Sequence, residues 1–477
     1  MKPGQKIHFV GIGGIGMSGI ARVLLQLGYQ VSGSDLKASA ITENLRELGA
    51  SIYLGHQAEN LAADVETVVL STAINEKNPE VKAALERGLQ IMIRSQMLGF
   101  LMRTRFGIAI AGTHGKTTTS SMIAHLLEYS GLRPTSVIGG EVYGLGSNAQ
   151  LGVGPHLVAE ADESDASFLE LEPKIAIITN IDSDVNLSAP HFEGHNFDYD
   201  KTMAMIERMF VDFMQRVPQD GKLILCADAP LVMEQRAKVT APVVTYGLHP
   251  ESDITAVDLH LKGFACKCTV VIGGRRAGSM TLHIPGKHNI QNALAAVAVG
   301  LELGLTFEQI KEGLEAFQGV KRRFQILGTQ GGVTVVDDYA HNPAKVMAAL
   351  HAARCCAQGR VIGVFQPHRY TRTKFLAHEF ADAFGDADIL LMTDIYSAGE
   401  MPIVGVRSEM LIEKVRAGGS KSRVVHTPGQ KEVVEFLRRE ATAGDVVMLL
   451  GAGDVGSWGP AILDFLTQPV TSRAAAL

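Results

Sequence analysis

The sequence predicts an α/β fold in three domains, from its length, its composition and a repeated alternation of strand-like and helix-like segments. Its 477 residues divide into about three domains of ordinary size, at roughly 150 residues each. Hydrophobic residues make up 46% and charged residues 20% of the chain, which also has 50 Gly and one Trp. This composition is typical of globular α/β proteins and excludes disordered, collagen-like and disulfide-stabilised chains.

Charge and cysteine content exclude several classes of partner. Lys and Arg total 44 against 50 Asp and Glu, a net charge of -6, so the chain as a whole has no attraction for nucleic acid or an anionic membrane. Five cysteines are too few for a disulfide framework, which favours reduced thiols in a cytoplasmic protein. The apolar start of the chain is better explained by a strand and a Gly-rich turn than by a signal peptide. The sequence has no run of 18 apolar residues, so no membrane span is predicted.

The first domain is expected over residues 1–105, where the pattern opens with a β-α-β unit. Its predicted elements are strands at 7–10, 29–34 and 67–71 and helices at 17–27 and 78–87.

The second domain is expected over 106–322 and the third over 323–477, because the same alternation resumes in each. The second has predicted strands at 106–111, 156–160 and 174–180, shorter strands between 226 and 283, and helices at 117–129 and 289–303. The third has predicted strands at 334–337, 360–366, 389–394 and 446–451, helices at 343–353 and 373–384, and a frayed tail at 468–477.

A first Gly-rich turn, with Gly11, Gly13, Gly14 and Gly16, lies between a predicted strand and a predicted helix. The G-x-G-x-x-G pattern lets the backbone approach a diphosphate at the helix N-terminus, and Asp35, about 20 residues on, suits a ribose hydroxyl. Taken alone, the turn favours a dinucleotide such as NAD. Another diphosphate ligand and a tight turn without a ligand are the alternatives.

A second Gly-rich loop, AGTHGKTTT at 111–119, also joins a strand to a helix. Its backbone N–H groups suit phosphates, Lys116 suits the β- and γ-phosphate oxygens, and Thr117 suits Mg²⁺. It departs from G-x-x-x-x-G-K-[ST] only in having Ile110 in place of the first glycine. We expect a nucleoside triphosphate here, and two phosphate-binding turns in one chain argue against a plain dehydrogenase.

Acidic segments follow two predicted strands of the central domain. EADESD begins at Glu160, and NIDSD occupies 180–184. Strands of an open α/β sheet bind ligands at their carboxyl ends, and carboxylate oxygens suit Mg²⁺. A solvated acidic loop that caps a helix is the alternative. The neighbouring Gly-rich loop at 111–119, called the phosphate loop below, favours the metal.

Three more polar segments carry candidate contacts. HNIQN at 288–292 opens a helix with two side-chain amides, for which simple capping is the alternative. DDYAHNP at 337–343 and QPHRYTRT at 366–373 each join a strand end to a helix. Arg369 and Arg372 suit a carboxylate or phosphates, against the alternative of solvated surface arginines.

Together these segments resemble the ATP-dependent Mur ligases of peptidoglycan synthesis, and the first turn and FQPHRYTRT resemble the branch that adds alanine. The segments that carry the resemblance are GIGGIGMSGIA (11–21), AGTHGKTTT (111–119), EADESDASFL (160–169), GKHNIQNALAA (286–296), KRRFQ (321–325), DDYAH (337–341), FQPHRYTRT (365–373), DIYSAGE (394–400) and GAGD (451–454).

The resemblance implies a Rossmann-like N-terminal domain for a UDP-sugar, a central P-loop ATPase domain with a mainly parallel sheet, and a Rossmann-like C-terminal domain that binds the amino acid. It implies that the first turn holds the diphosphate of the UDP-sugar and not NAD. The reaction implied joins L-alanine to the lactyl carboxylate of UDP-N-acetylmuramic acid through an acyl phosphate, with ATP and Mg²⁺. The protein implied is a cytoplasmic monomer or homodimer with no nucleic-acid or membrane partner.

The resemblance also implies residue roles. The implied catalytic residues are Lys116, Glu160, His341 and Arg323. The implied ATP contacts are Gly112, Thr113, His114, Gly115, Lys116, Thr117, Thr118, Asn289, Asn292, Arg323 and Asp338. The implied UDP-sugar contacts are Gly11, Gly13, Gly14, Gly16, Asp35 and Ser71. The implied contacts to the incoming alanine are His341, Arg369 and Arg372, and the expected metal ligands are Thr117, Glu160 and His191.

Two positions depart from the family pattern. The family has Asp-His where this chain has Asp184 and Val185, and valine cannot ligate the second Mg²⁺ that the histidine serves. We expect His191, or less readily His195, to replace it; water or Asp184 is the alternative. Asn342 stands where the alanine-adding branch has a second histidine.

Three other functions are alternatives. A recycling ligase that adds a tripeptide to the same sugar nucleotide shares the P-loop and the layout. An NAD-dependent oxidoreductase with an accessory ATPase gives the two arginines of FQPHRYTRT no role. A nucleotide sensor that binds without turnover is favoured only by Val185.

Overall fold

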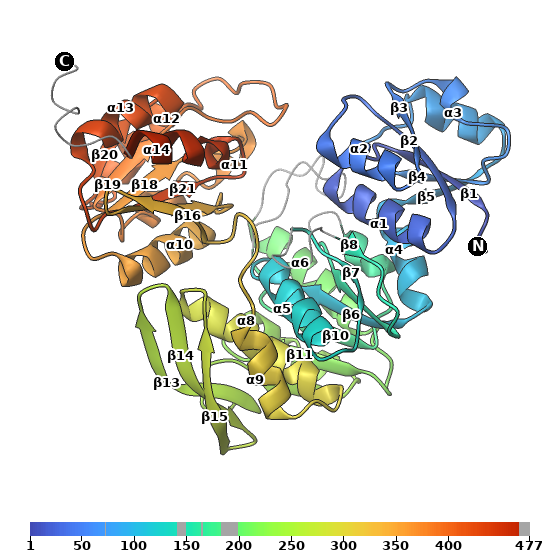
Figure 1. Cartoon of the computed structure of the whole chain (residues 1–477), viewed down its shortest axis with the longest axis horizontal. Coiled ribbons are helices and arrows are strands. Elements are labelled where there is room, and N and C mark those ends of the chain that lie inside the picture. The colour runs from blue at the N-terminus through green and yellow to red at the C-terminus, as the bar shows by residue number, and fades with distance from the viewer. Residues whose placement is uncertain (72, 141–148, 164–165, 183–198, 467–477) are drawn as a thin grey trace. The chain divides into compact units, whose positions relative to one another are not determined.

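The computed structural model describes residues 1–71, 73–140, 149–163, 166–182 and 199–466, and it confirms the predicted three-part α/β fold (Figure 1). Each part is built on its own sheet. The chain forms two compact units, which are described separately below. The first comprises Met1–Val257, Val270–Gly278 and Gln291–Phe317, and the second comprises Asp258–Thr269, Ser279–Ile290 and Gln318–Leu477.

The first sheet is parallel throughout, in the order β3-β2-β1-β4-β5. Its elements are β1 (Lys6–Val10), α1 (Ile15–Gln26), β2 (Gln30–Asp35), α2 (Ala40–Glu47), β3 (Ser51–Leu54), the 3₁₀ turn η1 (Ala58–Asn60), β4 (Thr67–Leu70), α3 (Pro79–Glu86), β5 (Gln90–Ile93) and α4 (Arg94–Arg103). Helix α1 buries Ile20, Val23 and Leu24, whose spacing places them on one face. The strand order reverses direction between β1 and β4, and open α/β sheets bind ligands at the carboxyl end of such a switch point.

The second sheet has ten strands in the order β15-β14-β13-β12-β11-β10-β6-β9-β7-β8. The run β12-β11-β10-β6-β9-β7 is parallel throughout, and β8 is antiparallel to β7. Its strands are β6 (Phe106–Ala111), β7 (Thr135–Val137), β8 (Ala149–Gln150), β9 (His156–Glu160), β10 (Ile175–Ile178), β11 (Lys222–Cys226), β12 (Val243–Tyr246), β13 (Ile254–Lys262), β14 (Ala265–Ile272) and β15 (Arg275–Leu282). The helices are α5 (Lys116–Tyr129), η2 (Ser167–Glu170), α6 (Tyr199–Met214), α7 (Pro230–Glu234), η4 (Arg236–Lys238), α8 (Lys287–Glu302) and α9 (Phe307–Glu315).

The third sheet has the order β16-β17-β21-β18-β19-β20, and only β16 is antiparallel to its neighbour. Its strands are β16 (Gln325–Gln330), β17 (Val333–Asp338), β18 (Val361–Phe365), β19 (Ile389–Met392), β20 (Arg423–His426) and β21 (Val446–Leu450). The helices are α10 (Pro343–Cys356), α11 (Tyr370–Phe375), η5 (Glu379–Asp382), α12 (Ser408–Ala417), α13 (Gln430–Glu440), η6 (Val455–Trp458) and α14 (Gly459–Leu466).

The helix predicted over 373–384 is wrong. Helix α11 ends at Phe375, and the short 3₁₀ turn η5 follows it. The rings of Phe380 and Phe384, beyond the end of α11, both pack on Phe365 of β18 with ring centroids 5.2 and 5.1 Å away. Packing against the sheet therefore overrides the local periodicity.

Two other predictions concern the C-terminal tail and membrane spans. The tail predicted at 468–477 lies outside the described residues. In the part of the chain that the structure describes, no helix combines the length and the apolar character needed to cross a membrane.

Candidate active site

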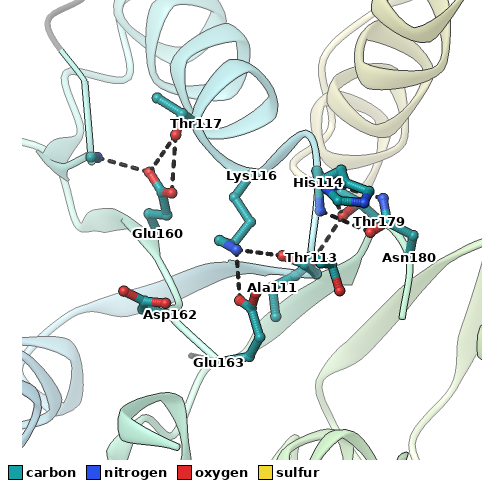
Figure 2. Close-up of polar contacts among 12 residues, drawn as sticks. Ala111, Thr113, His114, Lys116, Thr117, Glu160, Asp162, Glu163, Thr179 and Asn180 are labelled. Atoms are coloured by element: carbon teal, nitrogen blue, oxygen red, sulfur yellow. Dashed lines mark hydrogen bonds and ion pairs between the residues drawn. The ribbon is translucent and has the colours of Figure 1, made fainter. Parts of the chain in front are cut away.

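The phosphate loop lies between the buried strand β6 and helix α5, as predicted (Figure 2). Gly115 precedes the helix at φ +81°, a conformation that glycine adopts readily. A Cβ on Gly112 would lie 2.0 Å from the hydroxyl oxygen of Thr179, so the loop approaches β10 too closely for a side chain there. The loop backbone is therefore held tightly against the carboxyl edge of the sheet.

Residues after β10 hold the loop in place. The backbone N–H of His114 donates to Asn180 Oδ1 at 2.8 Å, and Asn180 Nδ2 donates back to the His114 carbonyl at 3.1 Å. The His114 ring reaches Asp182 Oδ2 at 3.0 Å, and the Thr113 hydroxyl accepts from the Asp182 backbone N–H at 2.9 Å. Asn180 and Asp182 thus serve the loop, whereas Asp184, Val185, His191 and His195 lie outside the described residues.

The ammonium group of Lys116 donates to the Gly112 carbonyl and to Glu163 Oε2, each at 2.6 Å (Figure 2). Both side chains are largely buried, with 13% of Lys116 and 6% of Glu163 exposed. Burial raises the pKa of the Glu163 carboxyl to about 7, although the Lys116 ammonium opposes this shift. Burial lowers the pKa of Lys116, but Glu163 and the neighbouring carboxylates outweigh it, so its pKa is raised and it stays charged.

Glu163 was not among the predicted site residues. It belongs to the acidic segment after β9, and only the upstream residue Glu160 was predicted as a ligand. The signal was present in the carboxylates at 160, 162 and 163, but no local pattern shows which of them turns toward Lys116. Ser164 and Asp165 of the same segment lie outside the described residues.

Thr117 and Glu160 come together as predicted. The Thr117 hydroxyl lies 3.0 Å from both carboxylate oxygens of Glu160, and the Gly139 backbone N–H donates to Glu160 Oε2 at 2.8 Å. These hard oxygen donors fit Mg²⁺, which keeps several waters and takes few protein ligands beside a nucleotide phosphate. The part of the chain that the structure describes contains no group of three or more His, Cys, Asp or Glu residues that could hold a metal ion.

Helix α8 contributes Asn292 to the loop. Its Oδ1 accepts from the Thr119 hydroxyl at 3.1 Å, and a Cβ on Gly115 would lie 2.8 Å from the same oxygen. Asn289 donates to the Pro285 carbonyl at 2.7 Å, so part of its amide is engaged at the start of the helix. Thr118 occupies the first turn of α5.

The first Gly-rich turn lies at the carboxyl edge of the first sheet. The backbone N–H groups of Gly11 and Ile12 donate to the Ser34 carbonyl at 2.9 and 3.0 Å, and Gly13 donates to Asp35 Oδ2 at 2.8 Å. Asp35, predicted to bind a ribose, thus also holds the turn itself. Ser71 packs against Gly11.

Helix α1 begins directly after this turn. Gly14 is its N-cap residue and makes no side-chain capping bond, and Gly16 lies against Arg94. A helix N-terminus of this kind attracts phosphate, because its first N–H groups and the helix dipole both favour an anion.

The residues predicted to bind the incoming amino acid lie in the second unit. Arg372 Nη1 is 3.0 Å from His368 Nδ1, and the rings of His341 and His368 are 6.1 Å apart. Burial, followed by Arg372 and Arg369, lowers the pKa of His368 to about 4, so this ring is neutral and accepts from Arg372. Arg369, with φ +69°, lies 3.9 Å from Glu400. His368 and Glu400 were not predicted as site residues.

In the same unit, Arg323 lies two residues before β16, and Asp338 is the last residue of β17. The Arg323 guanidinium lies over the Tyr339 ring, 5.2 Å from its centroid. Asp338, predicted to bind a ribose, accepts backbone N–H groups from Phe324 at 2.7 Å and Ala340 at 2.8 Å. Burial raises the pKa of Asp338, and Arg323 opposes this shift. Asn342 caps α10 by accepting from the Lys345 backbone N–H at 2.9 Å.

Comparisons with known proteins match the whole architecture. Three family models match: the Mur ligase family catalytic domain over residues 6–106, the Mur ligase middle domain over 110–300, and the Mur ligase glutamate ligase domain over 322–453.

Similar proteins cover nearly the full chain. The UDP-N-acetylmuramate--L-alanine ligase of Geobacter sp. (strain M21) is 48% identical over 96% of this chain and 97% of its own length. The enzyme of the same name from Pelobacter propionicus is 48% identical over 97% and 98%. The crystal structure of the UDP-N-acetylmuramate-alanine ligase of Thermotoga maritima is 29% identical, with a TM-score of 0.77 over 96% of this chain and 98% of that one. The chain therefore belongs to the Mur ligase family.

Proposed function

We propose that this chain is an ATP-dependent ligase that joins L-alanine to the lactyl carboxylate of UDP-N-acetylmuramic acid. The observation that carries the proposal is the end-to-end similarity, at 48% identity, to relatives named UDP-N-acetylmuramate--L-alanine ligase. The loop around Lys116 supplies the nucleotide chemistry that such a reaction needs.

A carboxylate is a poor electrophile, so the reaction needs ATP. In the first step a lactyl carboxylate oxygen attacks the γ-phosphorus of ATP and ADP leaves, which gives an acyl phosphate. In the second step the amine of alanine attacks the acyl carbon and phosphate leaves. Lys116 and the loop N–H groups stabilise the charge on the transferring phosphoryl group, and Arg323 adds charge from the C-terminal part.

Mg²⁺ is proposed to be held by Thr117 and Glu160 together with phosphate oxygens. When bound, it would neutralise negative charge on the phosphates. The Gly139 N–H and the Thr117 hydroxyl already orient the Glu160 carboxylate, which supports this assignment. His191 remains a candidate for a second metal contact.

The remaining substrate contacts are also proposed. The turn at 11–16, with Asp35 and Ser71, binds the diphosphate and ribose of the UDP-sugar at the N-terminus of α1. Asn289, Asn292 and Asp338 contact the adenosine of ATP. His341, Arg369 and Arg372 bind the incoming alanine, because paired guanidinium groups match a carboxylate and leave the amine free.

The proposed domains are 1–105 for the UDP-sugar, 106–322 for ATP and 323–477 for the amino acid. The three matched family models support this division. We further propose that the enzyme acts in the bacterial cytoplasm, where ATP and UDP-sugars are made, as a monomer or homodimer.

The tripeptide-adding alternative is less well supported. The relatives near 48% identity carry the alanine-ligase name, whereas a murein peptide ligase structure from Psychrobacter arcticus is 24% identical and shows only the shared fold.

The deciding experiment measures phosphate release from ATP and Mg²⁺ with UDP-N-acetylmuramic acid, with L-alanine, with both, and with a tripeptide replacing alanine. Release that needs both the sugar nucleotide and alanine supports the proposal. Release only with the tripeptide supports the recycling alternative, and no release with any acceptor contradicts a ligase.

A further inference from the structure

A buried polar cluster in the first sheet plays no part in the chemistry above. Its centre is Glu80, in the first turn of α3, whose side chain is fully buried. Glu80 Oε2 accepts from the Ser34 hydroxyl at 2.6 Å, and Oε1 accepts from Asn60 Nδ2 at 2.5 Å. Asn78 orders this turn by accepting from the Glu80 backbone N–H at 2.9 Å.

Two histidines complete the cluster. His56, which follows β3, places Nδ1 at 2.9 Å from Ser34 Oγ and 3.3 Å from Glu80 Oε2. His8, at the middle of β1, is fully buried, with Nδ1 2.9 Å from Ser32 Oγ and Nε2 3.8 Å from Glu80 Oε1. The His8 Nε2 atom has no hydrogen-bond partner among the described residues, so the nearby carboxylate is its main electrostatic contact.

The carboxylate at the centre of this cluster is kept ionised. Burial alone would raise the pKa of Glu80, but His8, Ser34 and Asn60 outweigh it and lower the pKa below its ordinary value. A buried charge is expensive to maintain, and a well-packed apolar residue in its place is often neutral or stabilising. The charge of Glu80 is therefore weak evidence for a purely stabilising role.

Ser34 connects the cluster to the first Gly-rich turn. Its hydroxyl is bound by Glu80, while its main-chain carbonyl accepts the N–H groups of Gly11 and Ile12. The next residue, Asp35, accepts from Gly13 through its side chain and from Gly55 through its carbonyl. The position of residue 34 thus sets the position of the turn.

The same contacts show which ring nitrogen of His56 carries a hydrogen. The Ser34 hydroxyl donates its proton to Glu80, so its oxygen can only accept from His56. Nδ1 of His56 therefore carries a hydrogen, and the neutral ring has its lone pair on Nε2. Nearby groups commonly set a histidine tautomer in this way.

We propose that Glu80 is a positioning residue for the sugar-nucleotide site: through Ser34 it holds the Gly-rich turn, and through Nδ1 it fixes the orientation and tautomer of His56 at the same sheet edge. This inference rests on the proposed function, because it assigns the turn to the UDP-sugar. Glu80 itself touches no substrate.

The test compares steady-state kinetics of the full-length wild type with those of Glu80→Gln. The variant is expected to raise KM for UDP-N-acetylmuramic acid about tenfold, as for loss of a charge-assisted hydrogen bond, with kcat and KM for ATP unchanged. Glu86→Gln, at the exposed end of the same helix, is the matched control and should match the wild type. Unchanged KM for the sugar nucleotide in Glu80→Gln, or an equal rise in KM for ATP, would overturn the proposal.

Two further measurements separate positioning from general support of the fold. Ser34→Ala should raise the same KM, and the double variant should be no worse than Glu80→Gln alone, because both act along one path. Ser34→Ala also keeps the buried carboxylate and so provides the test if Glu80→Gln fails to fold. Nitrogen NMR should show His56 protonated at Nδ1 in the wild type and redistributed in Glu80→Gln; additive KM effects or an unchanged tautomer would contradict the proposal.

The two proposals fail in different ways. If the wild type releases no phosphate with UDP-N-acetylmuramic acid and alanine, the proposed function fails. If the wild type is active and Glu80→Gln binds the sugar nucleotide equally well, only the role of Glu80 fails.

Discussion

The buried pair of Lys116 and Glu163 leads to a prediction in which stability can be restored without restoring catalysis. In Lys116→Met the ammonium is lost but the chain volume is nearly kept, so the Glu163 carboxyl is left buried without its cation. We expect this variant to lose phosphate release completely and also to be less stable. Adding Glu163→Met to it should restore stability without restoring activity, because the buried carboxyl is then gone as well.

The size of the effect follows from the geometry. At 2.6 Å and an effective dielectric constant of about 20, the attraction is about 6 kcal/mol before the loss of hydration is subtracted. Removing one partner of such a buried pair destabilises proteins by about 3–5 kcal/mol. That is a large share of a total stability of about 5–15 kcal/mol, and it should lower the melting temperature by roughly 10 °C. Replacing both partners with apolar residues is expected to be neutral or stabilising.

The stability of Lys116→Met should also change with pH in a definite direction. The pKa of Glu163 is already raised from 4.5 to about 7 in the folded protein, and loss of Lys116 raises it further. The folded variant then binds more protons than the unfolded chain from about pH 4.5 to above pH 7, so its stability rises as the pH falls through this range. The double variant lacks the carboxyl and should not show this rise.

The assay is thermal unfolding at about pH 5, 6 and 7.5, which spans the expected titration of the carboxyl, alongside phosphate release. Lys174→Met is the matched control, since Lys174 pairs with Asp220 at 2.9 Å while 41% and 74% of the two side chains are exposed. An exposed pair contributes about 0–1 kcal/mol, so this control should unfold close to the wild type. A Lys116→Met variant as stable as the control, or a double variant less stable than Lys116→Met, would refute the reasoning.

Three further predictions concern the substrate contacts. Gly13→Ala would place a Cβ 2.8 Å from Asp35 Oδ2, so it should raise KM for the sugar nucleotide at least tenfold while KM for ATP, measured in the same assay, stays constant. Gly139→Ala would place a Cβ 2.5 Å from the Glu160 carboxylate, so a Mg²⁺ titration of activity should need several-fold more metal for half-maximal rate. Arg372→Lys loses the planar fork that pairs with a carboxylate, so KM for alanine should rise about tenfold or more with little change in KM for ATP.

Strands and the loops at their ends were predictable because they carry strong local signals. The strands at 106–111 and 156–160 are observed at those residues, since short apolar runs bounded by glycine or charge are typical of buried strands. The phosphate loop follows directly, because a Gly-Lys-Thr run between a strand and a helix has one common arrangement. Helix α2 was missed although Ser39 and Thr42 form a capping box that marks its start.

The sequence could not predict which polar side chains from distant segments contact each other. The sequence shows carboxylates at 160, 162 and 163, but only the fold turns Glu160 toward Thr117 and Glu163 toward Lys116. Glu80 lies 46 residues from Ser34 in the chain, and it looks like an ordinary charged residue at a helix start until the fold brings α3 against the end of β2. Such long-range polar pairs leave no periodic trace in a single sequence.

The ambiguity of the first Gly-rich turn has a physical origin. A strand, a glycine turn and a helix N-terminus recognise a diphosphate whatever is attached to it, so the pattern at Gly11 and Gly13 suits both NAD and a UDP-sugar. We expect groups beyond the turn, such as Asp35 and His56 at the same sheet edge, to distinguish such ligands. In this chain both are held by hydrogen bonds among the strands, Asp35 to Gly13 and His56 to Ser34. We therefore expect specificity at this site to depend on the buried supports of the turn as much as on the turn itself, which is why a substitution at Glu80 is expected to alter sugar-nucleotide affinity without touching the ligand.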